Sequence, residues 1–239
     1  MSAPQLSVVI PAFNESARLP ATLARIREYL QRAALAHEIL VVDDGSRDDT
    51  AGRALAALQG CGRVLRNERN RGKGFSVRRG MLEASGERRL MSDADLSTPI
   101  EELNRLMRRM DEGFDIVIAS RALPEANIEV HQPFLRENMG RLFNVLVQAL
   151  VLPGLHDTQC GFKLWKAEAA LEAFSRARLD GFSFDVEALY LARKRGYRIA
   201  EIPVTWRNDA ATRVTLLGGS AAFLDVVRIR LFGLLGRYD

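Results

Sequence analysis

Short runs rich in β-branched residues alternate with longer segments of helical periodicity through the first half of the sequence. The short runs predict strands at Leu6–Ile10, Glu38–Val42, Arg63–Leu65, Arg88–Met91 and Asp115–Ala119. The segments between them predict helices at Ala17–Ala33, Asp49–Gln59, Lys73–Ala84 and Pro99–Glu112. Such alternation is typical of a parallel sheet covered by helices. The sequence therefore predicts an α/β fold, in which ligands bind outside the carboxyl ends of the strands.

The second half of the sequence is less regular and is interpreted as a helical annex to the first. Its pattern predicts helices at Phe134–Leu152, Lys166–Arg176 and Asp185–Arg195, followed by a strand at Arg198–Trp206. No internal repeat, low-complexity tract or Gly/Ser linker divides the chain. We therefore expect a single domain over residues 1–217 and a C-terminal amphipathic helix over residues 218–239.

Composition limits the classes of function that the chain can have. Because 34 Lys and Arg residues stand against 30 Asp and Glu residues, the formal net charge is only +4, and nucleic acid is not an expected partner. Cys61 and Cys160 lack the spacing of a zinc site or a disulfide framework, which favours a reducing cytoplasm. The histidines His37, His131 and His156 show no metal-ligand spacing and are expected to be structural.

The sequence predicts no export signal and no membrane-spanning helix. Met1–Gln5 lacks a basic segment followed by an apolar run. The most apolar stretch, Leu142–Leu155, is interrupted by Asn144, Gln148 and Pro153 and is shorter than the roughly 20 apolar residues that a spanning helix needs.

Polar residues follow the first two predicted strands at the point where each strand ends. Pro11-Ala12-Phe13-Asn14-Glu15 ends the first, and Asp43-Asp44-Gly45-Ser46 ends the second. A carboxylate at this edge can accept the imide N–H of a nucleotide base. A helix cap at Asn14 and an ordinary turn after the second strand would explain the same residues. Glycine-rich dinucleotide binding is excluded, because no GxGxxG follows the first strand.

Two carboxylates follow the fourth predicted strand, in the sequence Ser92-Asp93-Ala94-Asp95. Their oxygens are hard ligands that suit Mg²⁺ or Mn²⁺. A divalent ion held there would grip a diphosphate and offset the charge on a departing nucleotide. Turn and cap usage is the alternative explanation for such a pair, although its position after a strand favours the metal.

Four motifs in order resemble the family 2 glycosyltransferases. They are Val8–Glu15, Val41–Ser46, Asn70-Arg71-Gly72-Lys73-Gly74 and Asp93-Ala94-Asp95. The resemblance implies a GT-A fold, with a Rossmann-like nucleotide-binding sheet flanked by helices. It also implies a nucleotide-sugar site that includes Pro11, Ala12, Asn14, Glu15, Asp43, Lys73, Asp93 and Ala94. In this site Asp43 and Pro11–Glu15 hold the base, Asp93 faces the ribose or the metal, and Asp95 binds the metal.

The second half resembles the polyprenyl-phosphate hexose synthases within this family, and most of all the dolichyl-phosphate glucosyltransferases. The motifs are Ser120-Arg121, Arg136, Arg141 and Asp157–Lys163. The resemblance implies a catalytic set of Asp95, Arg121, Arg141 and Asp157, and an acceptor-phosphate set of Arg136, Arg141, Gln159 and Arg213. It divides the domain into a nucleotide-sugar half, about 1–121, and an acceptor half, about 122–217.

Two positions depart from the pattern of these synthases. The usual Ser-Lys after the last strand is Thr212-Arg213 here, and Ser97 stands where the related mannose synthases have glutamine. The likeness of Asp157–Lys163 to the glucose-transferring synthases makes UDP-glucose the first expected donor, and GDP-mannose remains the alternative.

Clustered arginines make chemical sense if two phosphorylated substrates meet, because guanidinium groups bind phosphates through paired hydrogen bonds. Arg141, Asn144 and Gln148 share one polar stripe of an otherwise apolar helix, which faces either the site or solvent. Asp185 and Glu187 lie two residues apart at a helix start, so at most one of them should point at a substrate.

The expected reaction is direct attack of the lipid phosphate on the anomeric carbon, with inversion. A phosphate dianion is already a nucleophile at neutral pH, so no strong general base is needed. A transferase that glycosylates a hydroxyl would instead need a carboxylate base such as Asp157 or Asp185. A non-catalytic protein that binds sugar nucleotides is the alternative outside enzymes.

The C-terminal segment Ser220–Tyr238 predicts a helix with one apolar arc. The arc contains Phe223, Leu224, Val227, Leu231, Leu234 and Leu235, while Asp225, Arg228 and Arg237 lie off it and Arg230 lies at its edge. We expect this arc to dock the enzyme peripherally on the cytoplasmic face of a membrane. Packing on the body of the domain, or on a second subunit in a homodimer, would bury the same residues.

Overall fold

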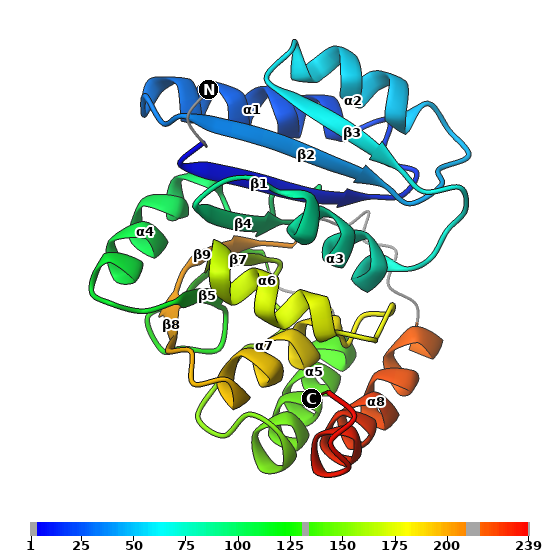
Figure 1. Cartoon of the computed structure of the whole chain (residues 1–239), viewed down its shortest axis with the longest axis vertical. Coiled ribbons are helices and arrows are strands. Elements are labelled where there is room, and N and C mark those ends of the chain that lie inside the picture. Colours follow the sequence, from blue (N-terminus) through cyan, green and yellow to red (C-terminus); the bar gives the residue numbers. More distant parts are fainter. Residues whose placement is uncertain (1–3, 131–133, 209–215, 239) are drawn as a thin grey trace.

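The computed structural model describes residues 4–130, 134–208 and 216–238, with side chains described throughout except at 134–136 and 216–220. Its centre is a seven-stranded sheet in the order β3-β2-β1-β4-β7-β5-β8 (Figure 1). The strands are β1 (Leu6–Ala12), β2 (His37–Asp43), β3 (Gly62–Arg66), β4 (Arg88–Ser92), β5 (Ile116–Ser120), β7 (Phe162–Lys166) and β8 (Ile199–Pro203). All five strands predicted in the first half are therefore confirmed.

Helices cover both faces of this sheet (Figure 1). The first half contributes α1 (Leu19–Arg32), α2 (Thr50–Leu58), α3 (Lys73–Glu83) and α4 (Leu103–Asp111), the last preceded by a 3₁₀ turn at Ile100–Glu102. The second half contributes α5 (Phe134–Leu150), α6 (Ala167–Arg176), α7 (Phe184–Lys194) and α8 (Leu216–Leu234). Each helix predicted in the two halves is present, with ends shifted by a few residues.

The sheet is mixed, whereas the alternating pattern predicted parallel strands only. β7 pairs antiparallel with both β4 and β5, and it joins the two parallel parts of the sheet. The sequence did not predict β7, because Lys163 and Lys166 interrupt its apolar pattern. Lys163 is nevertheless 1% exposed, since it forms an ion pair with Asp185 at 2.7 Å.

A small second sheet was also missed. The strand predicted at Arg198–Trp206 is two strands, β8 and β9 (Thr205–Arg207), and β9 pairs with β6 (Asn127–Val130). β6 is a four-residue strand with mostly exposed side chains, so it carries almost no hydrophobic signal.

Two apolar cores lie on opposite faces of the main sheet. One packs α1, α2 and α4 against it, and the other packs α3, α5, α6, α7 and α8. Within the described ranges, no helix is long and apolar enough to cross a membrane. Because β1, β2, β4 and β5 all run in one direction, their carboxyl ends and the start of antiparallel β7 meet at one edge.

Candidate active site

The loops after β1 and β2 are joined by their own polar side chains. Asn14 donates its backbone N–H to the Ser46 hydroxyl at 2.8 Å and accepts the Arg47 N–H on its side-chain oxygen at 2.8 Å. Asn14 is therefore not a helix cap. Its neighbours in the predicted nucleotide site, Pro11 and Ala12, are buried at the end of β1, and Glu15 forms an ion pair with Arg18.

Asp43 ends β2 and is fully buried. Its Oδ1 accepts the Ser46 N–H at 3.0 Å, so the turn interpretation is correct for this segment. Its buried Oδ2 accepts no hydrogen bond from the described residues, although the Arg66 Nε lies 3.3 Å away. A carboxylate oxygen with unused acceptor capacity thus lies at the edge where a base is expected to bind.

Asp44 holds the loop that leads to Lys73, a role that the sequence did not predict. Its carboxylate accepts the backbone N–H groups of Arg71 and Gly72 at 2.9 and 2.8 Å, and the Asn67 amide at 2.8 Å. The loop therefore has a fixed conformation where α3 begins.

Lys73 is the first residue of α3, and its Nζ lies 2.6 Å from Asp93 Oδ1. Burial opposes the charge on Lys73, but the carboxylates of Asp93 and Asp185 raise its pKa above the usual value. Burial and the neighbouring Asp93 raise the pKa of Asp95, which accepts the Ser97 N–H at 3.0 Å. The carboxylate of Asp93 thus acts on that of Asp95, and Ala94 between them is buried.

This pair suits a divalent cation. The described residues contain no group of three His, Cys, Asp or Glu side chains that could hold a metal ion without help. Mg²⁺, however, is usually bound by one or two carboxylates together with substrate phosphates and water. Asp93 and Asp95 are the two carboxylates at this edge that could supply such ligands.

Gly161, the residue before β7, packs directly against Asp93. The Asp93 N–H donates to the Gly161 carbonyl at 3.0 Å. A β-carbon at position 161 would overlap the Asp93 carboxylate, so only glycine fits here without displacing it. Behind this contact, Lys163 Nζ donates to Asp185 Oδ1 at 2.7 Å and to the Cys160 carbonyl.

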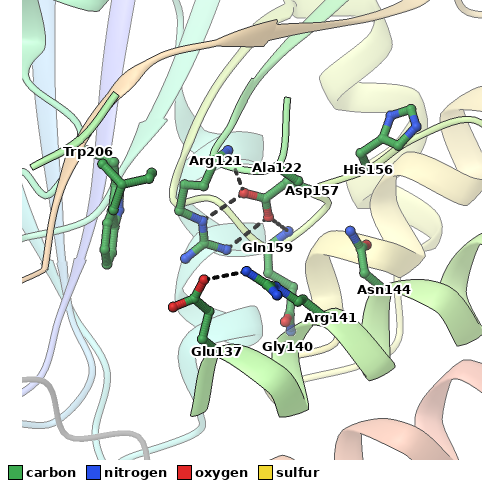
Figure 2. Close-up of a pocket in the computed structure, with 11 residues that line it drawn as sticks. Arg121, Ala122, Glu137, Gly140, Arg141, Asn144, His156, Asp157, Gln159 and Trp206 are labelled. Carbon is green, nitrogen blue, oxygen red and sulfur yellow. Dashed lines mark hydrogen bonds and ion pairs between the residues drawn. The ribbon is translucent and has the colours of Figure 1, made fainter. Parts of the chain in front are cut away.

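A cavity of about 470 Å³ lies where β5 ends, beside the loop that leads into β7 (Figure 2). Its lining comes from the end of β5, from α5, from the loop before β7 and from β9, and it includes Arg121, Glu137, Arg141, Asp157, Gln159 and Trp206. The sequence analysis placed Arg121, Arg141, Asp157 and Gln159 in one site, and the fold brings these four residues together.

Arg121 and Asp157 form the central pair of the cavity (Figure 2). Arg121 donates from Nε and Nη2 to the two Asp157 oxygens at 2.7 and 2.9 Å, and its backbone N–H donates at 2.9 Å. Burial opposes the charge on both side chains. The neighbouring Asp157 carboxylate nevertheless raises the pKa of Arg121, and the Arg121 guanidinium lowers the pKa of Asp157, so both stay ionised. The loop before β7 links this cavity to Asp93, because Gln159 lines the cavity and Gly161, two residues further on, accepts the Asp93 N–H.

Arg141 lies on α5 at the cavity wall. It donates to Glu137 Oε1 at 2.7 Å, and its side chain is 72% exposed. Asn144 from the predicted polar stripe lines the cavity too, so that stripe faces the site in part (Figure 2). Gln159 lines the cavity and donates its backbone N–H to Asp157 at 3.2 Å.

Two residues of the predicted acceptor-phosphate set cannot be placed. The backbone of Arg136 belongs to α5, but its side chain is outside the described residues. Arg213, like His131, lies outside the described residues altogether.

Sequence reasoning missed several contributors to the site. His156, expected to be structural, lines the cavity, and Nδ1 of its ring lies 3.1 Å from Glu201. The Trp206 ring lies 5.3 Å from the Arg121 guanidinium, within cation–π range. Neither could be assigned from spacing, because both reach the cavity only through the pairing of distant strands.

Comparison with solved structures identifies the fold as the GT-A type of glycosyltransferase. Mannosyl-3-phosphoglycerate synthase from Rubrobacter xylanophilus superposes with a TM-score of 0.74 at 24% identity, over 98% of this chain and 75% of that chain. Glucosyl-3-phosphoglycerate synthase from Mycobacterium tuberculosis, solved with Mn²⁺, UDP and phosphoglyceric acid, has a TM-score of 0.71 at 23% identity, over 98% of this chain and 78% of that one. At these identities the likeness is one of fold.

Sequence comparison identifies the family. The model described as Glycosyl transferase family 2 matches residues 7–174, and the chain belongs to this family of enzymes. Its curated relatives include the dolichyl-phosphate β-glucosyltransferase of Dictyostelium discoideum, 36% identical over 97% of this chain and 75% of the relative. The human enzyme of the same name is 37% identical over 88% of this chain and 69% of the relative. The resemblance inferred from the motifs is confirmed.

The contact of Gly161 with Asp93 predicts a selective defect. Gly161→Ala should displace the Asp93 carboxylate and weaken binding of Mn²⁺ with UDP at least about tenfold, while the melting temperature changes little. Calorimetry and thermal denaturation measure the two effects. Gly140→Ala is the control, because an added β-carbon there meets no atom within 4 Å. Equal nucleotide affinity in both variants would contradict this account of position 161.

Proposed function

We propose that the protein transfers glucose from UDP-glucose to the phosphate of a polyprenyl or dolichyl lipid, with inversion at the anomeric carbon. One observation carries the proposal: a single loop before β7 places Asp157 and Gln159 in the arginine-lined cavity and Gly161 against the Asp93 backbone, so the cavity and the carboxylates are joined by one short segment. The relatives named dolichyl-phosphate β-glucosyltransferase support the substrates.

The donor occupies the ends of β1, β2 and β4 in this proposal. Asp43 accepts the imide N–H of the base, supported by the unused acceptor capacity of its Oδ2. Asp93 and Asp95 would hold Mg²⁺ or Mn²⁺, a role supported by the complex of the structural neighbour with Mn²⁺ and UDP. When bound, the metal stabilises the negative charge of the leaving nucleotide. Lys73, fixed beside Asp93, contributes a further positive charge at the same place.

The acceptor phosphate enters the cavity with Arg121 and Arg141 as its binding groups. The Arg141 side chain can turn toward the acceptor phosphate at little cost, because its present ion pair with Glu137 is open to solvent and ion pairs of this kind contribute little stability. An oxygen of the phosphate dianion forms a bond to the anomeric carbon as the bond from that carbon to the nucleoside diphosphate breaks. The bonding electrons leave with the nucleotide, and no proton is transferred. Arg136 and Arg213 remain candidates for further phosphate contacts.

The carboxylates do not favour transfer to a hydroxyl. Both oxygens of Asp157 accept hydrogen bonds from Arg121, which lowers the pKa of Asp157 and makes it a poor proton acceptor. Burial raises the pKa of Asp185, but the residue is 5% exposed and its Oδ1 accepts a hydrogen bond from Lys163, which leaves little access for a hydroxyl. A phosphate acceptor needs no base, so it agrees better with this arrangement.

Helix α8 docks the enzyme on the cytoplasmic face of a membrane in this proposal. Its buried face, which includes Ala222, Val226 and Ile229, already packs on the core. Five residues of the predicted arc are exposed. Four lie on the opposite side of α8 and the fifth follows its last residue: Leu224, Val227, Leu231, Leu234 and Leu235. Phe223 was expected among them but packs edge-on against Phe143 of α5. Exposed Arg228 and Arg230 border the apolar residues, as suits anionic headgroups.

The reaction is tested with a panel of UDP- and GDP-sugars, polyprenyl phosphate and Mn²⁺, followed by mass spectrometry of the lipid. UDP-glucose should give a hexosyl-phosphate lipid. Chelation, or Asp95→Ala, should lower turnover at least about a hundredfold, because the leaving group loses its charge stabilisation. Product from GDP-mannose alone would contradict the sugar assignment. Full activity in the presence of chelator would contradict the metal assignment. Absence of any glycosylated lipid would contradict the proposed reaction.

Membrane docking is tested by replacing three exposed leucines of α8. The triple variant Leu224→Gln, Leu231→Gln, Leu234→Gln should lose at least about tenfold in sedimentation with phosphatidylglycerol vesicles, since burying one leucine contributes about 1.5–3 kcal/mol. Its activity on a short, soluble prenyl phosphate should persist. The matched control replaces Leu55, Leu82 and Leu171, exposed leucines of other helices. Equal vesicle binding by the two variants, or a change of oligomeric state in the α8 variant alone, would contradict docking.

A further inference from the structure

A buried hydrogen bond ties the C-terminal end of the chain to helix α7. Tyr238, four residues after α8 ends, is 2% exposed and donates its hydroxyl to Glu187 Oε1 at 2.7 Å. Glu187 is fully buried, although it was a candidate to face the substrate. Neither residue touches the cavity, and the proposed reaction uses neither of them.

The same carboxylate also holds the segment between α6 and α7. Glu187 Oε2 accepts the backbone N–H groups of Arg178 and Leu179 at 2.9 and 2.8 Å. With both oxygens occupied, the carboxylate is satisfied despite its burial. Loss of the Tyr238 hydroxyl would leave Oε1 buried without its donor, a costly state that favours rearrangement of the carboxylate and of the two amides it holds.

That segment in turn packs against the start of α3. The Asp180 carbonyl accepts the backbone N–H groups of Gly74 and Phe75 at 2.8 and 3.3 Å. The backbone contact is close: a β-carbon at Gly72 would overlap the Asp180 carbonyl, and one at Gly74 would lie 2.6 Å from the Leu179 carbonyl. The position of the segment therefore fixes the backbone on both sides of Lys73.

We propose that Tyr238 is a positioning residue for the donor site: through Glu187 and residues 178–180 it holds the start of α3, and with it the Lys73 side chain beside Asp93. The inference rests on the proposed function only in taking Lys73 as a donor contact. It gives the residues that follow α8 a role in the donor site, whether or not α8 itself contacts a membrane.

The chain offers a matched pair of variants. Tyr238→Phe removes the hydroxyl and keeps the ring, which packs against Phe232 and Tyr190 with centroids 5.9 and 6.3 Å apart. Tyr190→Phe removes a hydroxyl from the same aromatic cluster, on the same helix as Glu187. Among the described residues, no hydrogen bond joins the Tyr190 hydroxyl to residues 178–180. Glu187→Gln keeps the shape of the carboxylate and removes its charge, and serves as a second test.

Calorimetry with Mn²⁺ and UDP, and hydrogen exchange of the backbone amides, measure the effect in the full chain. Tyr238→Phe should weaken binding of Mn²⁺ with UDP about fivefold or more, the lower end of typical coupling between sites. Amides of residues 74–75 and 178–179 should exchange faster. Glu187→Gln should shift both readouts in the same direction, and Tyr190→Phe should leave both within about twofold of the unmodified protein.

A purely structural role for Tyr238 predicts a different result. The melting temperature of Tyr238→Phe would fall, while nucleotide affinity and exchange at residues 74–75 would match those of Tyr190→Phe, and this outcome would overturn the inference. Failure of the unmodified protein to bind UDP would count against the proposed donor instead. Hydrogen exchange at residues 74–75 in Tyr238→Phe would then still test whether Tyr238 acts on the start of α3, because that measurement needs no nucleotide.

Discussion

The insertion of β7 between β4 and β5 is the constraint on which the site depends. Antiparallel β7 begins at the edge where β4 ends, with Phe162 paired to Ser92. That register brings the Gly161 carbonyl to the Asp93 N–H and places Asp157 beside Arg121 at the end of β5. A loop from the second half of the chain thereby completes both the carboxylate pair and the cavity, so the two halves form one continuous site.

Side chains of opposite charge alternate along this crowded edge. Lys163 is paired with Asp185, whose charge also acts on Lys73, and Lys73 in turn lies against Asp93. Buried charges of this kind are tolerated when each is paired, and removal of one partner typically costs about 3–5 kcal/mol. The network leaves Asp95, with its raised pKa, as the carboxylate whose charge is least compensated by a direct cationic partner. That is the electrostatic environment in which a divalent cation binds most favourably.

Features set by local sequence could be predicted, and features set by tertiary pairing could not. A few consecutive residues are enough to identify the buried runs of β1 and β2 and the Asp93-Ala94-Asp95 motif. Each lies at the position that the sequence predicted. β7 was missed because the burial of Lys163 depends on Asp185, 22 residues away in the chain. The family resemblance supplied Arg121 and Asp157 as site residues, but not their bidentate pairing.

Helix α8 illustrates a second limit of sequence reasoning. It is apolar around much of its circumference, so its pattern cannot tell which side packs on the core. The side with Val226 and Ile229 is buried, and most of the predicted arc is exposed. Likewise, nothing local to Glu187 or Tyr238 indicates that they meet, because their contact joins α7 to the segment after α8, 51 residues away in the chain.

The central claim is that metal, nucleotide and acceptor phosphate share one site built by both halves of the chain. The most direct test is the ³¹P signal of a short prenyl monophosphate, recorded with the protein, UDP and paramagnetic Mn²⁺. The account predicts strong broadening of that signal, which disappears in Asp95→Ala although the prenyl phosphate still binds. A prenyl phosphate that binds the protein together with Mn²⁺ and UDP while its ³¹P signal stays sharp would contradict the account.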